Sequence, residues 1–288
     1  MTILEAFSYC KYRYRNWPKD SQDNVVSEFR GWLALGAPIN RPNGGHGIVL
    51  HLLIRNGLDS VVECLEIALQ AGARIEDRDE FSCGRKTPLQ VAAEVGNLEA
   101  VRLLLGHGAD INALPGSEFG RTALQAAVYG SNYENIPAIV ELLLSFGADV
   151  NVSPAEKGGI TALQGAAISG NITIAKTLLD QGANVNAGPA VEEGRTAIEG
   201  AAEHGRLDMV RFLISVGATG DPAKGFERAI ELAEKEHHFM IADFLRDYQD
   251  MSAGFGVGTD DVSNDEFFSE APAQGFVFSD EALENFPF

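Results

Sequence analysis

The chain has 288 residues, of which 45 % are hydrophobic and 22 % are charged. This composition is typical of globular proteins and excludes disorder throughout the chain. Its 22 Lys and Arg residues against 41 Asp and Glu residues give a net charge of −19. Such a charge argues against direct binding to nucleic acid or to an anionic membrane, and it favours a protein partner with a basic patch.

Residues 1–45 are expected to form N-terminal capping helices. The segment from Ile3 to Tyr14 is predicted to be a first helix, and the apolar residues from Val25 to Leu35 indicate its partner. The pair Gly36-Ala37 follows directly, as it does after later helices of the chain. A cap of this kind is expected at the end of a repeat array.

Residues 46–223 contain four segments that begin with threonine and share one pattern. They start at Thr87, Thr122, Thr161 and Thr196, at spacings of 35, 39 and 35 residues, and the first reads Thr87-Pro88-Leu89-Gln90-Val91-Ala92-Ala93. Threonine is a good N-cap, and apolar residues at i, i+3 and i+4 give a helix one apolar face. Each segment is therefore predicted to be a short helix with Thr at its start.

A second apolar segment follows each of these helices and ends in Gly-Ala. The four pairs begin at Gly108, Gly147, Gly182 and Gly217. Glycine at this place suits the left-handed cap that ends many helices. The recurrence of two helices in phase predicts a stack of helical repeats.

This pattern resembles the ankyrin repeat, which has a period of about 33 residues and a T-P-L-H-x-A signature. The resemblance covers about residues 20 to 250. Gln90, Gln125, Gln164 and Glu199 replace the signature His, and His51 aligns with it in a degenerate copy. The segment from Gly194 to Val210 is also similar to fungal ankyrin proteins. The resemblance implies an all-α ankyrin-repeat solenoid of about four regular and two degenerate or capping repeats, with extended hairpin fingers.

Three segments between repeats are about two residues longer than is usual in that family. They are residues 112–120, 151–159 and 186–194, here named fingers 1, 2 and 3. They are long enough to project over a concave groove, but ordinary variation in hairpin length explains them equally well.

In ankyrin repeats, the residue before the Thr and those seven and eight after it face the groove. By position this row consists of Lys86, Glu94, Val95, Arg121, Tyr129, Ile160, Ile168, Ser169, Arg195, Glu203 and His204. The candidate binding set omits Val95 and Ile168 and adds Phe119 and Lys157 from the fingers. Arg121, Tyr129 and Arg195 are the kind of anchor that dominates interfaces. Both arginines are also compatible with solvation or with ion pairs to nearby acids.

Residues 224–250 are predicted to be a C-terminal capping repeat, and the repeat pattern ends there. Residues 251–288 contain eight acidic and seven Phe residues and no Lys or Arg. This composition is typical of a disordered interaction segment, with an inert solubilising tail as the alternative. We expect the segment around Glu266-Phe267-Phe268 to dock weakly on a basic row formed by Lys86, Arg121 and Arg195, in competition with the partner.

The sequence contains no H-E-x-x-H, Walker loop, nucleophile elbow or Cys/His metal spacing, so no cofactor or metal is expected. The favoured function is therefore non-catalytic protein binding by a monomer. One alternative is a transcriptional or signalling regulator that acts through the acidic aromatic tail. Another is an enzyme with a pocket under the fingers, with Glu118, Tyr129, Lys157 or His204 as acid or base.

The cysteines and the hydropathy pattern bear on the compartment. Cys10, Cys64 and Cys83 lie far apart and do not have the spacing of a disulfide framework. The chain has no apolar run of about 18 residues, and its N-terminus lacks an apolar signal core. We expect an intracellular protein, cytoplasmic or nuclear.

Overall fold

The structure is a computed structural model, which describes residues 22–36, 39–40, 48–56, 61–79, 85–130, 134–220 and 225–254. Within these ranges it contains thirteen helices and two isolated parallel bridges, but no strand. The predicted all-α repeat fold is confirmed. The chain divides into two units, Met1–Asp250 and Met251–Phe288, and nearly all described residues belong to the first.

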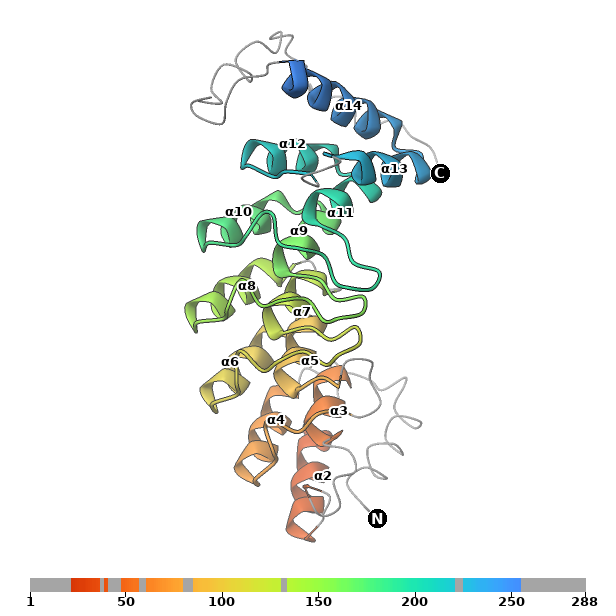
Figure 1. Cartoon of the computed structure of the whole chain (residues 1–288). Coiled ribbons are helices and arrows are strands. Elements are labelled where there is room, and N and C mark those ends of the chain that lie inside the picture. Colours follow the sequence, from red (N-terminus) through yellow and green to blue (C-terminus); the bar gives the residue numbers. More distant parts are fainter. Residues whose placement is uncertain are drawn as a thin grey trace, which may run out of the picture. The chain divides into compact units, whose positions relative to one another are not determined.

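Inner and outer helices alternate along the chain. The inner helices are α3 (Ile48–Asn56), α5 (Pro88–Val95), α7 (Ala123–Tyr129), α9 (Ala162–Ser169), α11 (Ala197–Glu203) and α13 (Glu227–Lys235). The outer helices are α2 (Gln22–Ala34), α4 (Val61–Gln70), α6 (Leu98–Gly106), α8 (Ile136–Ser145), α10 (Ile172–Asp180), α12 (Leu207–Ser215) and α14 (Phe239–Gly254). Figure 1 shows the helix pairs stacked along one direction, with the three fingers projecting from the same side.

The four predicted threonine caps are confirmed. In α5, α7, α9 and α11 the Thr hydroxyl accepts from the backbone N–H three residues later, and the side chain there accepts from the Thr N–H. This reciprocal capping box satisfies two N–H groups that the first helical turn leaves without partners. The predicted glycines also end their helices in the left-handed region, for example Gly108 at φ 83° and Gly147 at φ 88°.

The glutamines that replace the signature His link each cap to the following finger. Gln90 Nε2 donates to the carbonyl oxygen of Ala113 at 2.8 Å, and Gln125 Nε2 donates to that of Val152 at 2.8 Å. Gln164 makes the same link to the start of finger 3. The fourth repeat has Glu199 instead, and this carboxylate lies 3.6 Å from an Arg228 nitrogen. Helices α5, α7 and α9 are therefore each tied to the next finger through one buried glutamine.

The core lies between successive helix pairs. Leu89, Leu124, Leu163 and Ile198, the residues two after each Thr, are only 1–3 % exposed. Successive inner helices contact each other from α3 through α13, and outer helices α2, α4, α6 and α8 do so in turn. Small residues permit this approach, because a Cβ added at Gly200 would lie only 2.7 Å from Ile168 of the preceding inner helix. Burial of these apolar side chains is the main stabilising contribution.

An asparagine ladder connects the turns between repeats, and the sequence analysis did not foresee it. Asn112 donates from Nδ2 to Gly147 O at 3.2 Å and accepts from Asp149 N at 2.9 Å. The same pair of bonds recurs at Asn40, Asn151 and Asn186. Each of these asparagines stands four residues after the Gly of a Gly-Ala pair, so the signal is present in the sequence.

The described residues include part of each end of the array. Helix α2 corresponds to the second helix predicted for the N-terminal cap. The first predicted helix, from Ile3 to Tyr14, lies outside the described residues. Helices α13 and α14 form the last pair, and α14 continues to Gly254, beyond the expected boundary at residue 250. Residues 255–288, most of the predicted tail, lie outside the described residues. No helix in the described ranges is long and apolar enough to cross a membrane.

Candidate functional site

The three fingers are joined edge to edge by backbone hydrogen bonds. Phe119 N donates to Lys157 O at 2.9 Å, and Gly158 N donates to Glu192 O at 3.0 Å. Lys157 also forms parallel bridges with Glu118 on one side and Glu192 on the other. The fingers therefore form one continuous layer beside the inner helices, which is visible at the right of Figure 1.

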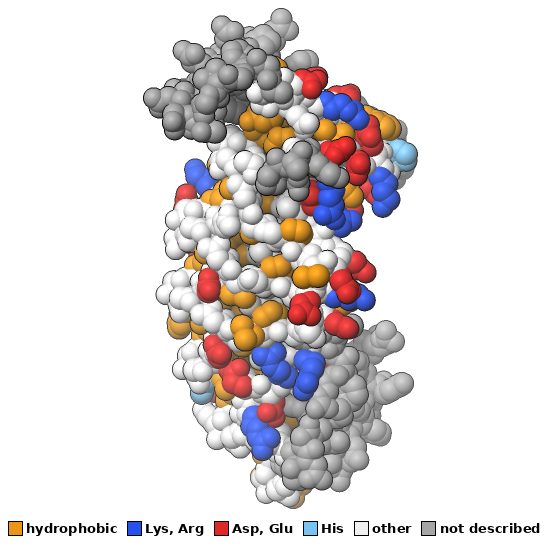
Figure 2. Space-filling view, viewed as in Figure 1, with side chains coloured by type: hydrophobic (Ala, Val, Ile, Leu, Met, Phe, Trp, Pro, Cys, Tyr) orange, Lys and Arg blue, Asp and Glu red, His pale blue; other side chains and the backbone are white. Residues whose placement is uncertain are grey.

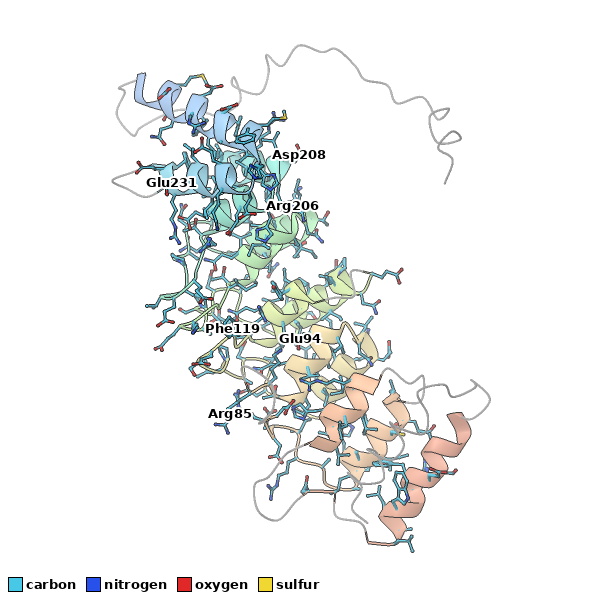
Figure 3. The ribbon with its side chains drawn as sticks, turned by 90° about the vertical axis from the view of Figure 1, so that its right-hand side faces the viewer. Arg85, Glu94, Phe119, Arg206, Asp208 and Glu231 are labelled. Atoms are coloured by element: carbon cyan, nitrogen blue, oxygen red, sulfur yellow. The ribbon has the colours of Figure 1, made fainter. Side chains whose placement is uncertain are left out.

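Phe119 has an unusual backbone conformation near the tip of finger 1. Its φ is +51°, in the left-handed region, and Gly158 at the equivalent place in finger 2 has a φ of +59°. A bulky residue in this region carries strain, which surrounding contacts must hold. Its ring lies over finger 2, because a Cβ added at Gly158 would be 2.3 Å from it. The Phe119 ring remains 36 % exposed on the finger side of the molecule (Figure 3).

Two of the three cations in the predicted row are paired with acids on their own repeats. Lys86 Nζ lies 2.5 Å from Glu94 Oε1. Arg195 binds both carboxylate oxygens of Glu203, at 2.9 and 3.1 Å, and also donates to Gly194 O. Each carboxylate neutralises its cation, so for Arg195 the alternative of an ion pair with a nearby acid holds.

Arg121 occupies the same position in its repeat but has no acid opposite it. Tyr129 takes the place of the Glu, and the guanidinium carbon lies 3.9 Å from the centroid of its ring. Tyr129 is 51 % exposed, so this cation–π pair lies at the surface. The Nε of Arg121 is buried and has no hydrogen-bond partner among the described residues.

The remaining members of the candidate binding set have other environments. Ile160 is 8 % exposed and packs at Gly165, so its side chain is buried, and its predicted role in partner binding stays a prediction. Ser169 Oγ donates to Ala166 O, and a ring nitrogen of His204 lies 3.0 Å from Gly200 O. Lys157 Nζ lies 3.9 Å from Glu192.

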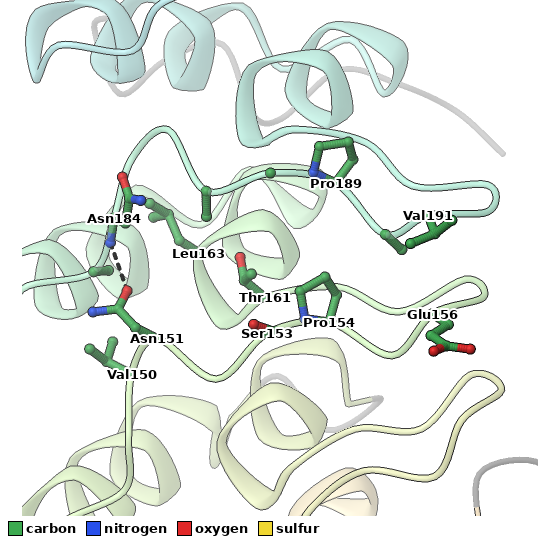
Figure 4. A pocket seen from close by; sticks show the side chains of 14 residues that line it. Val150, Asn151, Ser153, Pro154, Glu156, Thr161, Leu163, Asn184, Pro189 and Val191 are labelled. Atoms are coloured by element: carbon green, nitrogen blue, oxygen red, sulfur yellow. Dashed lines mark hydrogen bonds between the residues drawn. The ribbon is translucent and has the colours of Figure 1, made fainter.

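A cleft of about 550 Å³ lies between fingers 2 and 3 (Figure 4). Pro154 and Pro189 line it from the two fingers, and Val191 beside them is 87 % exposed. The proposed acids and bases Glu118, Tyr129, Lys157 and His204 are not among its lining residues. The structure therefore does not bring these four side chains together in this cleft.

Charged side chains gather along the finger side of the molecule. Figure 2 shows acidic and basic groups at the right-hand edge, where Figure 1 places the fingers. Exposed carboxylates of the finger tips are those of Glu118, Glu156, Glu192 and Glu193. The local field around the tips is therefore predominantly negative, in agreement with the net charge of the chain.

The described residues hold no group of three or more His, Cys, Asp or Glu side chains that could bind a metal ion. Cys64 is a buried free thiol. Burial, together with the nearby charge of Glu63, raises its pKa to about 11. A thiol with this pKa stays protonated at neutral pH, which makes it a poor nucleophile and metal ligand.

Comparison with known proteins bears on the family. A family model described as "Ankyrin repeats (3 copies)" matches residues 50–154 and 133–224. The chain is 40 % identical over 75 residues to "NF-kappa-B inhibitor cactus" of Drosophila yakuba and of Drosophila melanogaster. It is 34 % identical over 76 residues to an ankyrin repeat protein of Fowlpox virus (strain NVSL).

These matches are partial. Each covers 26 % of this chain and only 14 %, 14 % and 11 % of the three relatives. None of these three relatives is fungal, so the expected similarity to fungal ankyrin proteins stays a prediction.

Proposed function

Since the chain belongs to the ankyrin-repeat family, we propose that it binds a partner protein, without catalysis, through the surface formed by its fingers and inner helices. Ankyrin repeats are protein-interaction modules, and repeat arrays of this kind present extended binding surfaces. The observation that carries the proposal is the cation–π pair formed by half-buried Arg121 and exposed Tyr129. Arg and Tyr are the residue types most enriched at the energetic centres of protein interfaces.

The neighbours of this pair fit the same role. Phe119 stands two residues before Arg121 and is 36 % exposed, and its contacts with finger 2 hold its left-handed backbone. Leu114 in finger 1 and Val191 in finger 3 are 70 % and 87 % exposed. Exposed apolar side chains on a rigid layer offer area to a partner at a low entropic cost. The two ion pairs of the row would form the polar rim around the contact with the partner. They are Lys86 with Glu94 and Arg195 with Glu203.

A regulatory role is the second proposal. Two relatives carry the name NF-kappa-B inhibitor, which favours inhibition of a regulatory protein as the consequence of binding. The acidic aromatic composition of residues 251–288 supports a contribution from the tail. We further propose a monomer that acts in the cytoplasm or nucleus and prefers a partner with a basic patch. Docking of the segment around Glu266-Phe267-Phe268 would depend on Arg121, the one cation of the predicted row without a carboxylate partner.

Site-specific crosslinking tests the proposed binding surface. A photoreactive phenylalanine analogue is placed at Tyr129, at Val191, and at the control position Phe146, which is 53 % exposed at the end of an outer helix. In extracts of cells that express the full chain, we expect one discrete partner to crosslink from Tyr129 and Val191. Crosslinks to that partner from Phe146 alone would refute the proposal.

A further inference from the structure

The four repeats each contain one equivalent pair of residues. The first member of each pair stands just before the Thr, and the second stands seven residues after it. Lys86 with Glu94 and Arg195 with Glu203 are ion pairs, and Ile160 with Ile168 is apolar. Only the pair of Arg121 and Tyr129 joins a cation to a side chain that does not neutralise it. The array therefore leaves one positive charge on this row, next to an aromatic ring.

The hydrogen-bonding state of Arg121 differs from that of Arg195 at the same position. Arg195 directs Nε and one terminal nitrogen to Glu203 and its other terminal nitrogen to Gly194 O. Arg121 Nε has no partner among the described residues, although it is buried. Leaving a buried donor unpaired is unfavourable, and more so for a charged group. Because Nε itself is buried, a carboxylate from outside would pair with the terminal nitrogens of the guanidinium.

An acid of the preceding repeat, Glu94, is already engaged. The backbone of Glu94 lies close to the end of α7, because a Cβ added at Gly130 would be 2.5 Å from Glu94 O. Its carboxylate, however, lies 2.5 Å from Lys86 Nζ. The Glu94 carboxylate is thus paired with Lys86 of its own repeat.

We infer, on the basis of the proposed function, that Arg121 and Tyr129 bind a carboxylate of the partner protein. In the partner's sequence this acid stands beside an aromatic or aliphatic side chain. The carboxylate would accept from the Arg121 guanidinium, for which planar bidentate pairing is the preferred geometry. The adjacent apolar side chain would lie on the exposed rings of Tyr129 and Phe119. Charge complementarity at this one position selects the acid.

A carboxylate fits this position better than a phosphate group does. Phosphate recognition in proteins commonly uses several arginines, because the group carries nearly two negative charges. Here Arg121 is the single uncompensated cation of the predicted row, and Lys86 and Arg195 are committed to their own acids. One guanidinium matches the single charge of a carboxylate.

The test uses peptides selected from a random phage library against the full-length chain. We expect the selected peptides to share an Asp or Glu next to an aromatic or aliphatic residue. The Kd of one such peptide is measured by fluorescence anisotropy for the wild type, for Arg121→Gln and for Arg102→Gln. Arg102 lies exposed on outer helix α6, so its variant makes the same change of charge away from the row.

Arg121→Gln is expected to weaken binding at least tenfold, and Arg102→Gln less than twofold. Changing the peptide's acid to its amide should weaken binding to the wild type by the same factor as Arg121→Gln does. The same change in the peptide should not alter its affinity for the Arg121→Gln variant, because the two groups act as a pair. If the amide peptide loses as much affinity for Arg121→Gln as for the wild type, the carboxylate binds elsewhere and the inference is wrong. Tighter binding of a phosphoserine peptide would overturn the assignment to a carboxylate.

Hydrogen exchange separates failure of this inference from failure of the proposed function. Peptide protection of α7 and the fingers without coupling to Arg121 would leave the binding surface in place and remove only the carboxylate contact. Protection confined to the outer helices would contradict both. A selection that yields no binding peptide would likewise count against both.

Discussion

Gln125 connects the cap of α7 to the next finger, and its replacement tests whether that connection holds neighbouring repeats together. Its side chain is 2 % exposed, accepts from Thr122 N at 3.0 Å and donates to Val152 O at 2.8 Å. Gln125→Ala leaves both backbone groups without a partner. At about 1–3 kcal/mol for each of the two buried unpaired groups, we expect a total loss of about 2–6 kcal/mol in the free energy of unfolding.

A second variant separates the two hydrogen bonds. Gln125→Glu retains an acceptor for Thr122 N but presents a carboxylate to Val152 O, and unlike Glu199 it has no arginine opposite it. Burial should raise the pKa of the introduced carboxyl above the value of about 4.3 in the unfolded chain. Its protonated form can donate to Val152 O, so this stability is present at low pH and lost as the pH rises through the folded pKa.

The assay is urea unfolding followed by circular dichroism at pH 5, 6 and 7, with each variant compared to the wild type at the same pH. The deficit of Gln125→Glu is expected to shrink towards pH 5, whereas that of Gln125→Ala should not. Gln181→Ala, an exposed glutamine at the end of α10, serves as the control and should change stability by less than about 0.5 kcal/mol. A loss that small for Gln125→Ala, or a deficit of Gln125→Glu independent of pH, would refute the argument.

Three further outcomes are expected. Leu124→Ala should lower the free energy of unfolding by about 2–5 kcal/mol because Leu124 is 1 % exposed, whereas Leu114→Ala at a 70 % exposed position should cost under about 0.5 kcal/mol, as calorimetry can check. With the other cysteines changed to serine, Cys64 should react with a thiol reagent at pH 8 only after unfolding, since burial raises its pKa to about 11; rapid labelling would contradict this. Truncation after Gly254 should shift Tm by less than about 2 °C, and a larger shift would make the tail a structural element.

Local chemistry explains why the fold was predictable from the sequence. A threonine cap, an apolar face and a glycine in the left-handed region each depend on residues within one helix or its ends, and they recur at Thr87 and Gly108 as at Thr122 and Gly147. Repetition in phase then indicates which helices are neighbours. The asparagine ladder is equally regular, but its hydrogen-bond partners are backbone groups of the following repeat. A local sequence pattern does not identify partners in another repeat.

The site was harder to predict because it depends on distances across a helix. Lys86 and Glu94 are eight residues apart, and only the length and packing of α5 bring their charged ends together. Ile160 was expected at the surface, yet the space beside Gly165 admits its side chain. Sequence position thus predicted a row of residues that stays a prediction, while side-chain pairing decides which of them is available to a partner.

The dependence of binding on salt follows from the same distribution of charge. Arg121 is the one cation of the predicted row without a carboxylate partner, on a chain with a net charge of −19. An acidic peptide is therefore repelled at long range although its carboxylate is attracted at contact. The screening length is about 10 Å at 0.1 M salt, so added salt removes the long-range repulsion before it weakens a close contact.

Stopped-flow measurement with two peptides that carry the same carboxylate motif tests this argument. The association rate of a peptide flanked by Glu should rise with salt, and that of a peptide flanked by Lys should fall. Because both use the same contact, Arg121→Gln should raise their dissociation rates by the same factor. Association rates that fall with salt for both peptides would mean that the surface near Arg121 is positive over a wide area, contrary to the pairing of Lys86 and Arg195 with their own acids.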